Sequence, residues 1–278
     1  ANNYVLDVTP AGNSTVVASF AANLGTLGGG AAVVFASGFL APTGTDPKFG
    51  LFAALPNGTV LELPAVGNAR LQVIHNSASP TVDIWVNGSK LLSDFKYRTA
   101  TPFIDVPSNV VLNIGVAPSP SSSPADIIAT FPVTLATGEK YVALATGLVG
   151  STSTPFKLSI IASAKETASV GTNVALNVFH GSTDAPAIDV VNRIGGGVLV
   201  TNLSYDQASG YLEVPAQAYA LGLRATGNNP VLATFKADVT SLAGGAGVVF
   251  ASGALAGNPA FGLFVALPNG TVVALPAI

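Results

Sequence analysis

The stretch FGLFAALPNGTVLELPAV at residues 49–66 recurs as FGLFVALPNGTVVALPAI at residues 261–278, and fourteen of the eighteen positions are identical. Upstream of it, residues 4–38 align without a gap on residues 219–253, and both copies contain the run VVFASG. Short runs of Val, Phe, Leu and Ala that are broken by Asn-Gly are typical of strands joined by tight hairpin turns. The sequence therefore carries the same β-rich unit at both of its ends.

A second, independent repeat lies between these two copies. LQVIHNSASPTVDIWVNG, which starts at residue 71, aligns with LNVFHGSTDAPAIDVVNR, which starts at residue 176, with one residue inserted in the later copy. DFKYRTATPFIDVP at residues 94–107 then matches NLSYDQASGYLEVP at residues 202–215. We predict an all-β fold of tandem immunoglobulin-like antiparallel β-sandwiches, with complete modules at residues 67–172 and 173–278 and an incomplete N-terminal module at residues 1–66.

The repeated motif is similar to that of a known family. The pattern L-x-V-x-H-x-S, then P-x-V-D or P-x-I-D, a Tyr, [FY]-x-[DE]-V-P and a later A-x-G resembles domain-of-unknown-function family 4397. Members of that family occur, often in tandem, in secreted and cell-surface proteins of bacteria and archaea. The resemblance covers both complete modules, and residues 1–66 resemble the C-terminal part of one. It implies an extracellular β-sandwich and brings no catalytic residues with it.

The composition narrows the classes of function. Charged residues make up only 9% of the chain, the net charge is −3 and the basic residues are scattered, so we expect no nucleic-acid partner. No apolar run reaches the ~20 residues of a membrane helix, so we expect no membrane span. Cysteine is absent, which excludes disulfides and thiolate catalysis. Methionine is absent as well. We expect a secreted or cell-surface protein, with Ala1 exposed by signal-peptide removal, and no cofactor.

Each complete module contains the residue types of a hydrolase triad, but not its motif. These residues are His75, Ser77 and Asp83 in one module and His180, Ser182 and Asp189 in the other. No G-x-S-x-G elbow presents a nucleophile, and one histidine per module with dispersed carboxylates does not predict a metal site. We therefore expect no enzyme activity, and we expect these side chains to bond to loop backbone groups within each sandwich.

Trp85 and the Asn-x-Ser/Thr sequons are the candidate contacts for a ligand or a glycan. An exposed Trp85 could stack on a sugar ring, whereas a buried Trp is the commoner case in a sandwich. SPSSSPAD at residues 119–126 is expected to be a loop of the same module. The possible glycosylation sites are Asn13, Asn57, Asn87, Asn202 and Asn269, and two of them, Asn57 and Asn269, are also the Asn-Gly turns of the repeated hairpin.

Residues 1–66 lack the counterpart of residues 173–215, so their apolar face and strand edge need a cover. The side chains predicted to take part are Tyr4, Phe20, Phe35, Phe49, Phe52 and Ile278. One interpretation is completion by another copy, and a head-to-tail contact of that kind produces a filament. Another is packing within the chain onto the module at residues 67–172, which has SAKETASVGTN at residues 163–173 in place of the LPNGTV hairpin. A third is that the first half was lost by proteolysis or lies before residue 1.

Our functional hypothesis is a secreted structural protein that assembles head to tail into an extracellular filament or surface layer. In it, a neighbouring subunit completes the N-terminal module by strand addition or exchange. The alternative is a monomeric cell-surface adhesin or glycan-binding module, with surface glycans as its partner.

Overall fold

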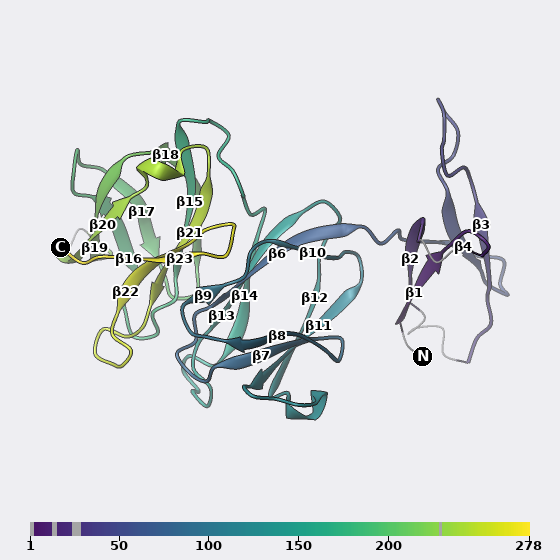
Figure 1. The fold of residues 1–278 in the computed structure, drawn as a ribbon, viewed down its shortest axis with the longest axis horizontal. Coiled ribbons are helices and arrows are strands. Elements are labelled where there is room, and N and C mark those ends of the chain that lie inside the picture. Colours follow the sequence, from purple (N-terminus) through teal and green to yellow (C-terminus); the bar gives the residue numbers. More distant parts are fainter. Residues whose placement is uncertain (1–2, 13–15, 24–28, 228–229) are drawn as a thin grey trace. The chain divides into compact units, whose positions relative to one another are not determined.

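The computed structural model describes residues 3–12, 16–23, 29–227 and 230–278, and this part of the chain consists of strands and turns without an α-helix (Figure 1). Two short 3-10 turns, η2 (Pro124–Asp126) and η3 (Thr240–Leu242), interrupt the strands. The predicted all-β class is confirmed.

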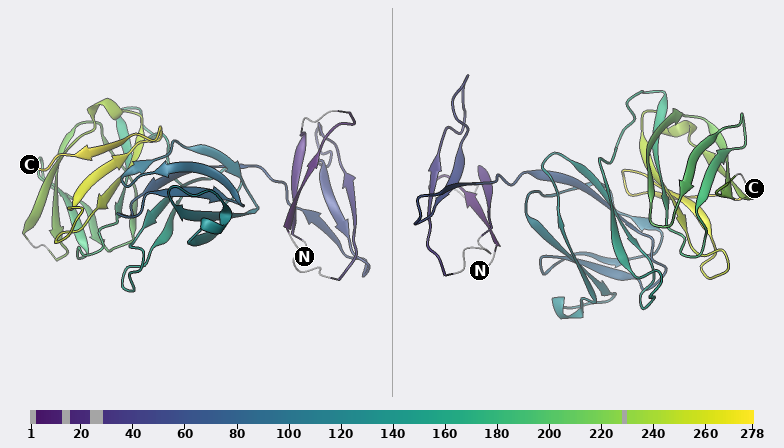
Figure 2. Two further views of the ribbon diagram at one scale, coloured as in Figure 1. Left: turned by 60° about the horizontal axis from the view of Figure 1, so that its bottom comes forward. Right: turned by 180° about the vertical axis from the view of Figure 1, so that it is seen from behind.

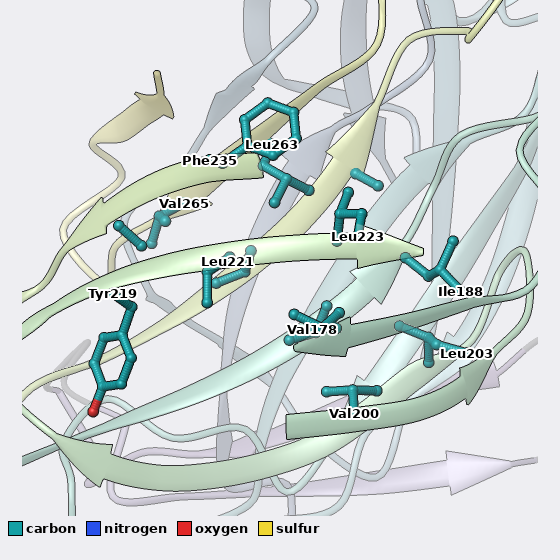
Figure 3. Close-up of a cluster of buried hydrophobic side chains, with 14 of the residues drawn as sticks. Val178, Ile188, Val200, Leu203, Tyr219, Leu221, Leu223, Phe235, Leu263 and Val265 are labelled. Carbon is teal, nitrogen blue, oxygen red and sulfur yellow. The ribbon is translucent and has the colours of Figure 1, made fainter. Parts of the chain in front are cut away.

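The sandwich at residues 173–278 has two sheets in the orders β18-β15-β21-β22-β23 and β17-β16-β19-β20. Its strands are β15 (Asn173–His180), β16 (Ile188–Asn192), β17 (Val198–Leu203), β18 (Ala208–Pro215), β19 (Ala218–Ala225), β20 (Val231–Asp238), β21 (Ala246–Ser252), β22 (Gly262–Ala266) and β23 (Val272–Leu275). Alternate residues of these strands point inward, because successive side chains of a strand face opposite sides of the sheet. They form a dry core between the sheets that includes Val178, Leu221 and Phe235 (Figure 3).

The sandwich at residues 67–172 repeats this plan with sheets ordered β10-β6-β13-β14 and β12-β11-β7-β8, and β9 also pairs with β6. Its strands are β6 (Asn68–His75), β7 (Val82–Val86), β8 (Ser89–Phe95), β9 (Thr99–Ala100), β10 (Ile104–Pro107), β11 (Val111–Pro118), β12 (Ala129–Thr134), β13 (Lys140–Thr146) and β14 (Lys157–Ala162). The sheet ends at β14, whereas β22 is followed by β23. The missing hairpin noted in the sequence thus leaves β14 as an edge strand.

Residues 1–66 form two small sheets, β1-β2 and β3-β4-β5. The strands are β1 (Asn3–Val8), β2 (Ala18–Asn23), β3 (Val33–Ser37), β4 (Gly50–Ala54) and β5 (Val60–Leu63). They are the counterparts, in order, of β19 to β23, and even the isolated bridge between Phe20 and Ala65 recurs between Phe235 and Ala277. The repeated sequence therefore folds the same way in both places.

One detail departs from the purely antiparallel prediction. The pairs β6–β13 and β15–β21 are parallel, while neighbouring pairs such as β13–β14 and β21–β22 are antiparallel. Parallel neighbours require a long crossover connection, which the intervening strands of the other sheet supply.

The chain divides into two compact units, one formed by residues 1–69, 106–112 and 132–138 and the other by the remaining residues. Within the second unit, the larger sheets of the two sandwiches lie side by side (Figure 2). An apolar cluster fills the contact between them. Its buried members are Ile74, Phe103, Val142, Leu144, Ile161, Ala164, Phe179, Val248, Phe250 and Ala266. Residues on the outer faces of these sheets are therefore core residues of the pair.

Candidate functional site

The two histidines lie at the ends of β6 and β15, and both are fully buried. The imidazole Nε2 of His75 lies 3.1 Å from the carbonyl oxygen of Pro80, and that of His180 lies 2.9 Å from the carbonyl oxygen of Pro186. Burial lowers the pKa of both imidazoles, so they are neutral at physiological pH. The predicted bonds to loop backbone groups are confirmed.

The side chains of the neighbouring serines and aspartates bond to groups other than the histidines, although the backbone N–H of Ser77 donates to Nδ1 of His75 (3.3 Å). The hydroxyl of Ser77 donates to the carbonyl of Gly147 (2.8 Å), and that of Ser182 donates to Asp184 (3.3 Å). Asp189 accepts from the backbone N–H of Asn202 and from the guanidinium of Arg224. The structure does not bring the histidine, serine and aspartate of either module together as a proton relay.

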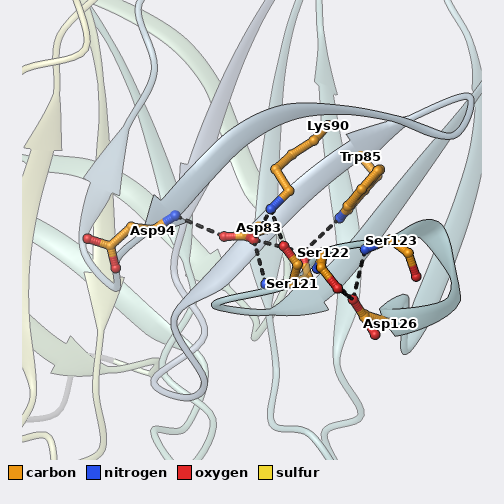
Figure 4. Close-up of polar contacts among 8 residues, drawn as sticks. All are labelled: Asp83, Trp85, Lys90, Asp94, Ser121, Ser122, Ser123 and Asp126. Carbon is orange, nitrogen blue, oxygen red and sulfur yellow. Dashed lines mark hydrogen bonds and ion pairs between the residues drawn. The ribbon is translucent and has the colours of Figure 1, made fainter.

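Asp83 is the centre of a polar network in the 67–172 sandwich (Figure 4). It lies on β7 and accepts hydrogen bonds from the ammonium of Lys90 (2.7 Å), the hydroxyl and N–H of Ser121 (2.7 and 2.9 Å) and the N–H of Asp94 (3.0 Å). Burial alone would raise its pKa, but these donors outweigh the burial and hold the pKa of Asp83 far below its usual range. The buried carboxylate thereby fixes the loop at residues 119–126.

That loop covers Trp85, which is only 6% exposed. The indole Nε1–H donates to the hydroxyl of Ser121 (3.0 Å), and the ammonium of Lys90 lies 5.3 Å from the ring centroid. Trp85 is not exposed for stacking on a sugar ring, because the loop at residues 119–126 and Lys90 cover its indole ring. The buried alternative holds, and the sequence could not reveal the loop as its cover.

The asparagines of the Asn-x-Ser/Thr sequons are the remaining candidate contacts. Asn57, Asn87, Asn202 and Asn269 are exposed, whereas Asn13 lies outside the described residues. In the part of the chain that the structure describes, no three His, Asp or Glu side chains group as a metal site, and no helix is long and apolar enough to cross a membrane. The amide oxygens of Asn57 and Asn269 each accept the N–H two residues later (3.0 Å), as expected for the predicted turns.

The free edge of β3 is the feature that distinguishes residues 1–66 from a complete sandwich. Its counterpart β21 pairs on one side with β22 and on the other, in parallel, with β15. β3 pairs with β4 and is the end strand of its sheet, just as β1 pairs with β2 and lacks a counterpart of β16. Among the described residues, no strand pairs with the second side of β3, which is a strand edge of the kind that can accept a further strand.

β3 and β21 differ in the burial of their side chains as they differ in strand pairing. Every residue of β21 is buried, whereas every residue of β3 is exposed, although both strands read VVFAS. Val33 is 67% exposed and its counterpart Val248 only 1%; Phe35 is 40% exposed and its counterpart Phe250 is fully buried. Identical side chains thus lie in opposite environments.

The six predicted assembly side chains separate into two groups. Tyr4 and Ile278 are exposed, and Phe35 stacks on Phe52 with ring centroids 5.6 Å apart on the open side of the sheet. Phe20 is buried, and Phe49 packs against it at 6.0 Å in a small core with Leu51 and Leu63. The expectation that Phe20 and Phe49 would be left uncovered is wrong, because the half-module closes over them with its own two sheets.

A groove of about 710 Å³ lies between β14 and the part of the later sandwich that includes Asn177, Phe179 and Tyr211. Leu158 and Ile160 line it, and Ile160 is exposed where its counterpart Val265 is buried in the core of the later sandwich. The difference arises because β23 covers the equivalent position on β22. Among the described residues, β1, β3 and β14 therefore each have an unpaired edge whose counterpart, on β19, β21 or β22, is paired in the 173–278 sandwich.

Comparison with known proteins identifies the repeated module. No curated protein matches the chain. The family model described as a domain of unknown function, DUF4397, matches residues 69–191 and again residues 174–271, so that residues 1–68 lie outside both matches. The matched residues cover most of both complete sandwiches, with their buried histidines and Asp83 and Asp189, and end before β23. The chain is a member of the DUF4397 family and carries its module in tandem.

Proposed function

We propose that this protein is an extracellular structural protein that assembles head to tail, with residues 1–66 of one subunit completed by strands of the next. The observation that carries the proposal is the exposed edge of β3, whose sequence twin β21 is buried and paired on both sides. Unpaired edges with apolar side chains are covered in native proteins, and strand addition by another chain is a common cover.

The register of the complete sandwich defines the strand that would fit. β15 pairs in parallel with β21, so that Asn177 is opposite Val248 and Phe179 is opposite Phe250. Transferred to β3, the same register places an L-x-V-x-H strand beside Val33 and Phe35. β6 and β15 of a neighbouring copy are the segments of this type, and because each is paired on both sides in its own sandwich, its donation would be a strand exchange. Main-chain bonds would supply affinity, and the alternating side chains would supply specificity.

The second surface that such a strand would cover is the inner face of β3. Val34 is exposed there, while its counterpart Val249 is buried in the core of the later sandwich. Burying a Val side chain contributes about 1.5 to 3 kcal/mol. The donated segment would thus gain backbone pairing and apolar burial at the same site.

A contact between different surfaces of two copies repeats without end unless its rotation happens to close a ring. The proposed completion is of this heterologous kind, so it leads to a filament or layer. The composition fits an extracellular material: charged residues are 9%, and cysteine and methionine, which oxidants attack, are absent. The proposal requires no catalytic residue and no cofactor.

The test is competition by the missing strands. A synthetic peptide of residues 173–192, which spans β15 and β16, is added to the 278-residue chain, and assembly is followed by sedimentation and negative-stain electron microscopy. We expect the peptide to occupy the β3 edge and to shorten or prevent filaments. The matched control peptide carries Asn177→Pro, which removes a backbone N–H from the pairing strand.

A second version of the chain, without residues 1–66, separates assembly from folding. We expect it to keep two folded sandwiches and to form no filaments. Filaments that persist after the deletion would refute the proposal, and so would a chain that stays monomeric at every concentration. The latter result would favour the binding alternative.

A further inference from the structure

The outer face of the β3-β4-β5 sheet carries side chains whose counterparts are buried between the two complete sandwiches. Val33 and Phe35 on β3, and Val60 on β5, are exposed. Their counterparts Val248, Phe250 and Val272 all belong to the apolar cluster shared by the two sandwiches. This face is distinct from the inner face and the strand edge that a donated strand would cover, because Val33 and Phe35 point away from Val34.

The contact between the two sandwiches uses the same face on both sides. Equivalent positions of the two modules meet in the cluster, namely Ile74 and Phe179, Val142 and Val248, and Leu144 and Phe250. A contact in which the same patch serves both partners is self-complementary. The face is therefore built to pack against another copy of itself.

The polar contacts around the cluster follow the same symmetry. Arg98 lies at the position of Asp206 in the aligned modules. The guanidinium of Arg98 donates to the hydroxyl of Ser252 (3.0 Å) and to the carbonyl of Ala260 (2.7 Å), across the contact. Asp206 reaches in the opposite direction, to Lys157 and Ser159. Two equivalent positions thus bridge to equivalent parts of the other sandwich.

The aromatic pair of this face is already formed in residues 1–66. Phe35 and Phe52 stack with centroids 5.6 Å apart and an interplanar angle of 25°. Phe250 and Phe264 stack at 5.7 Å and 27° inside the contact. The exposed face therefore has the shape of the buried one.

We infer that the outer face of the β3-β4-β5 sheet packs against the same face of a second copy of this chain, in the manner of the two complete sandwiches. Within the chain, the equivalent faces at residues 67–172 and 173–278 are already buried against each other. The outer face of the β3-β4-β5 sheet has no equivalent partner among the described residues. The same face of another copy of the chain would be its equivalent partner. The inference does not depend on strand exchange.

The two contacts have different consequences. A same-face contact closes a pair of subunits, whereas strand completion continues from subunit to subunit. If both operate, head-to-tail filaments would be joined side by side through their N-terminal units.

The experiment introduces charge at the centre of the face in the 278-residue chain. Val33→Asp and Val33→Lys each place like charges in a same-face contact, while an equimolar mixture of the two variants places opposite charges there. We expect each variant alone to weaken self-association by at least about tenfold, as judged by sedimentation velocity over a dilution series, and the mixture to recover it. The matched control is Leu232→Asp on β20, because Leu232 is 62% exposed and Val33 is 67% exposed.

Val33 is exposed, so the substitutions remove no core contact, and circular dichroism verifies folding. Self-association of Val33→Asp equal to that of the unaltered chain overturns the inference. Loss in both variants without recovery in the mixture overturns the same-face assignment. If strand exchange alone is wrong, the unaltered chain forms discrete pairs that the competing peptide of residues 173–192 does not affect. If the same-face contact alone is wrong, filaments form with Val33→Asp and are blocked by that peptide.

Discussion

Asp83 is the residue on which the cover of Trp85 depends. Its carboxylate pairs with Lys90 and accepts bonds from Ser121 in a site that is almost closed to solvent. Asp83→Asn leaves the Lys90 ammonium without its counter-charge, so we expect the free energy of unfolding of the 67–172 sandwich to fall by about 3 kcal/mol. Denaturant unfolding monitored by Trp85 fluorescence measures it. Asp126→Asn at the exposed end of the same loop is the control, and an equal loss there would contradict this reading.

Glu166 provides a pH-dependent contribution at the same scale. The hydrogen bond from Arg70 is the main cause that lowers the pKa of Glu166 to about 2, with Lys140 adding to it against the opposing effect of burial. The unfolded carboxyl has a pKa of about 4.3, so between these values the unfolded state binds more protons and stability falls as the pH falls. We expect a loss of about 1 kcal/mol between about pH 5 and pH 2, since the pair is partly exposed.

The comparison for that prediction is Glu166→Gln, measured by denaturant unfolding at a series of pH values. The variant should be less stable than the unaltered chain at neutral pH and should show a shallower decline in acid. Parallel curves for the two proteins would mean that Glu166 contributes nothing to the acid sensitivity.

At the scale of the element, the A-x-G motif marks where β13 turns toward β14. Gly147 has a φ of 82°, and a methyl group on it would overlap the backbone carbonyl of Pro155. Gly147→Ala should therefore cost more than about 3 kcal/mol of unfolding free energy. Gly138→Ala is the matched control, because Gly138 has a φ of 79° but open space around its Cα; there the loss should stay near about 1 kcal/mol. Equal losses would mean that the clash is relieved elsewhere.

The same glycine lies in a motif that could be read from the sequence, and so do the Asn-Gly hairpins and most strands. The role of the outer faces of the sheets was harder to predict from the sequence. VVFAS in β3 and β21 is apolar at its first four positions, a pattern typical of strands that are buried on both faces. That signal could have indicated a cover outside each sandwich as well as inside it. The cover of Trp85 could not be predicted, because Ser121 follows it by 36 residues and only the fold brings them together.

For the whole molecule, the shared cluster joins the two complete sandwiches through one apolar contact. Apolar side chains from both sandwiches lose their cover when either one unfolds, so we expect a single cooperative transition for residues 70–278. In the chain without residues 1–66, Trp85 reports on the earlier sandwich alone, whereas circular dichroism reports on the strands of both sandwiches. The two probes should give coincident unfolding curves.

Phe250→Ala tests this coupling most directly, because Phe250 lies in the later sandwich and is fully buried against the earlier one. Truncating a buried Phe costs about 3 to 5 kcal/mol, partly through the cavity that it leaves. If the sandwiches are coupled, the Trp85 transition shifts to lower denaturant together with the circular dichroism transition, although Trp85 lies in the other module. A Trp85 transition that stays in place while the circular dichroism transition moves would show that each sandwich is stable alone, and the shared face would then be a contact between independent modules.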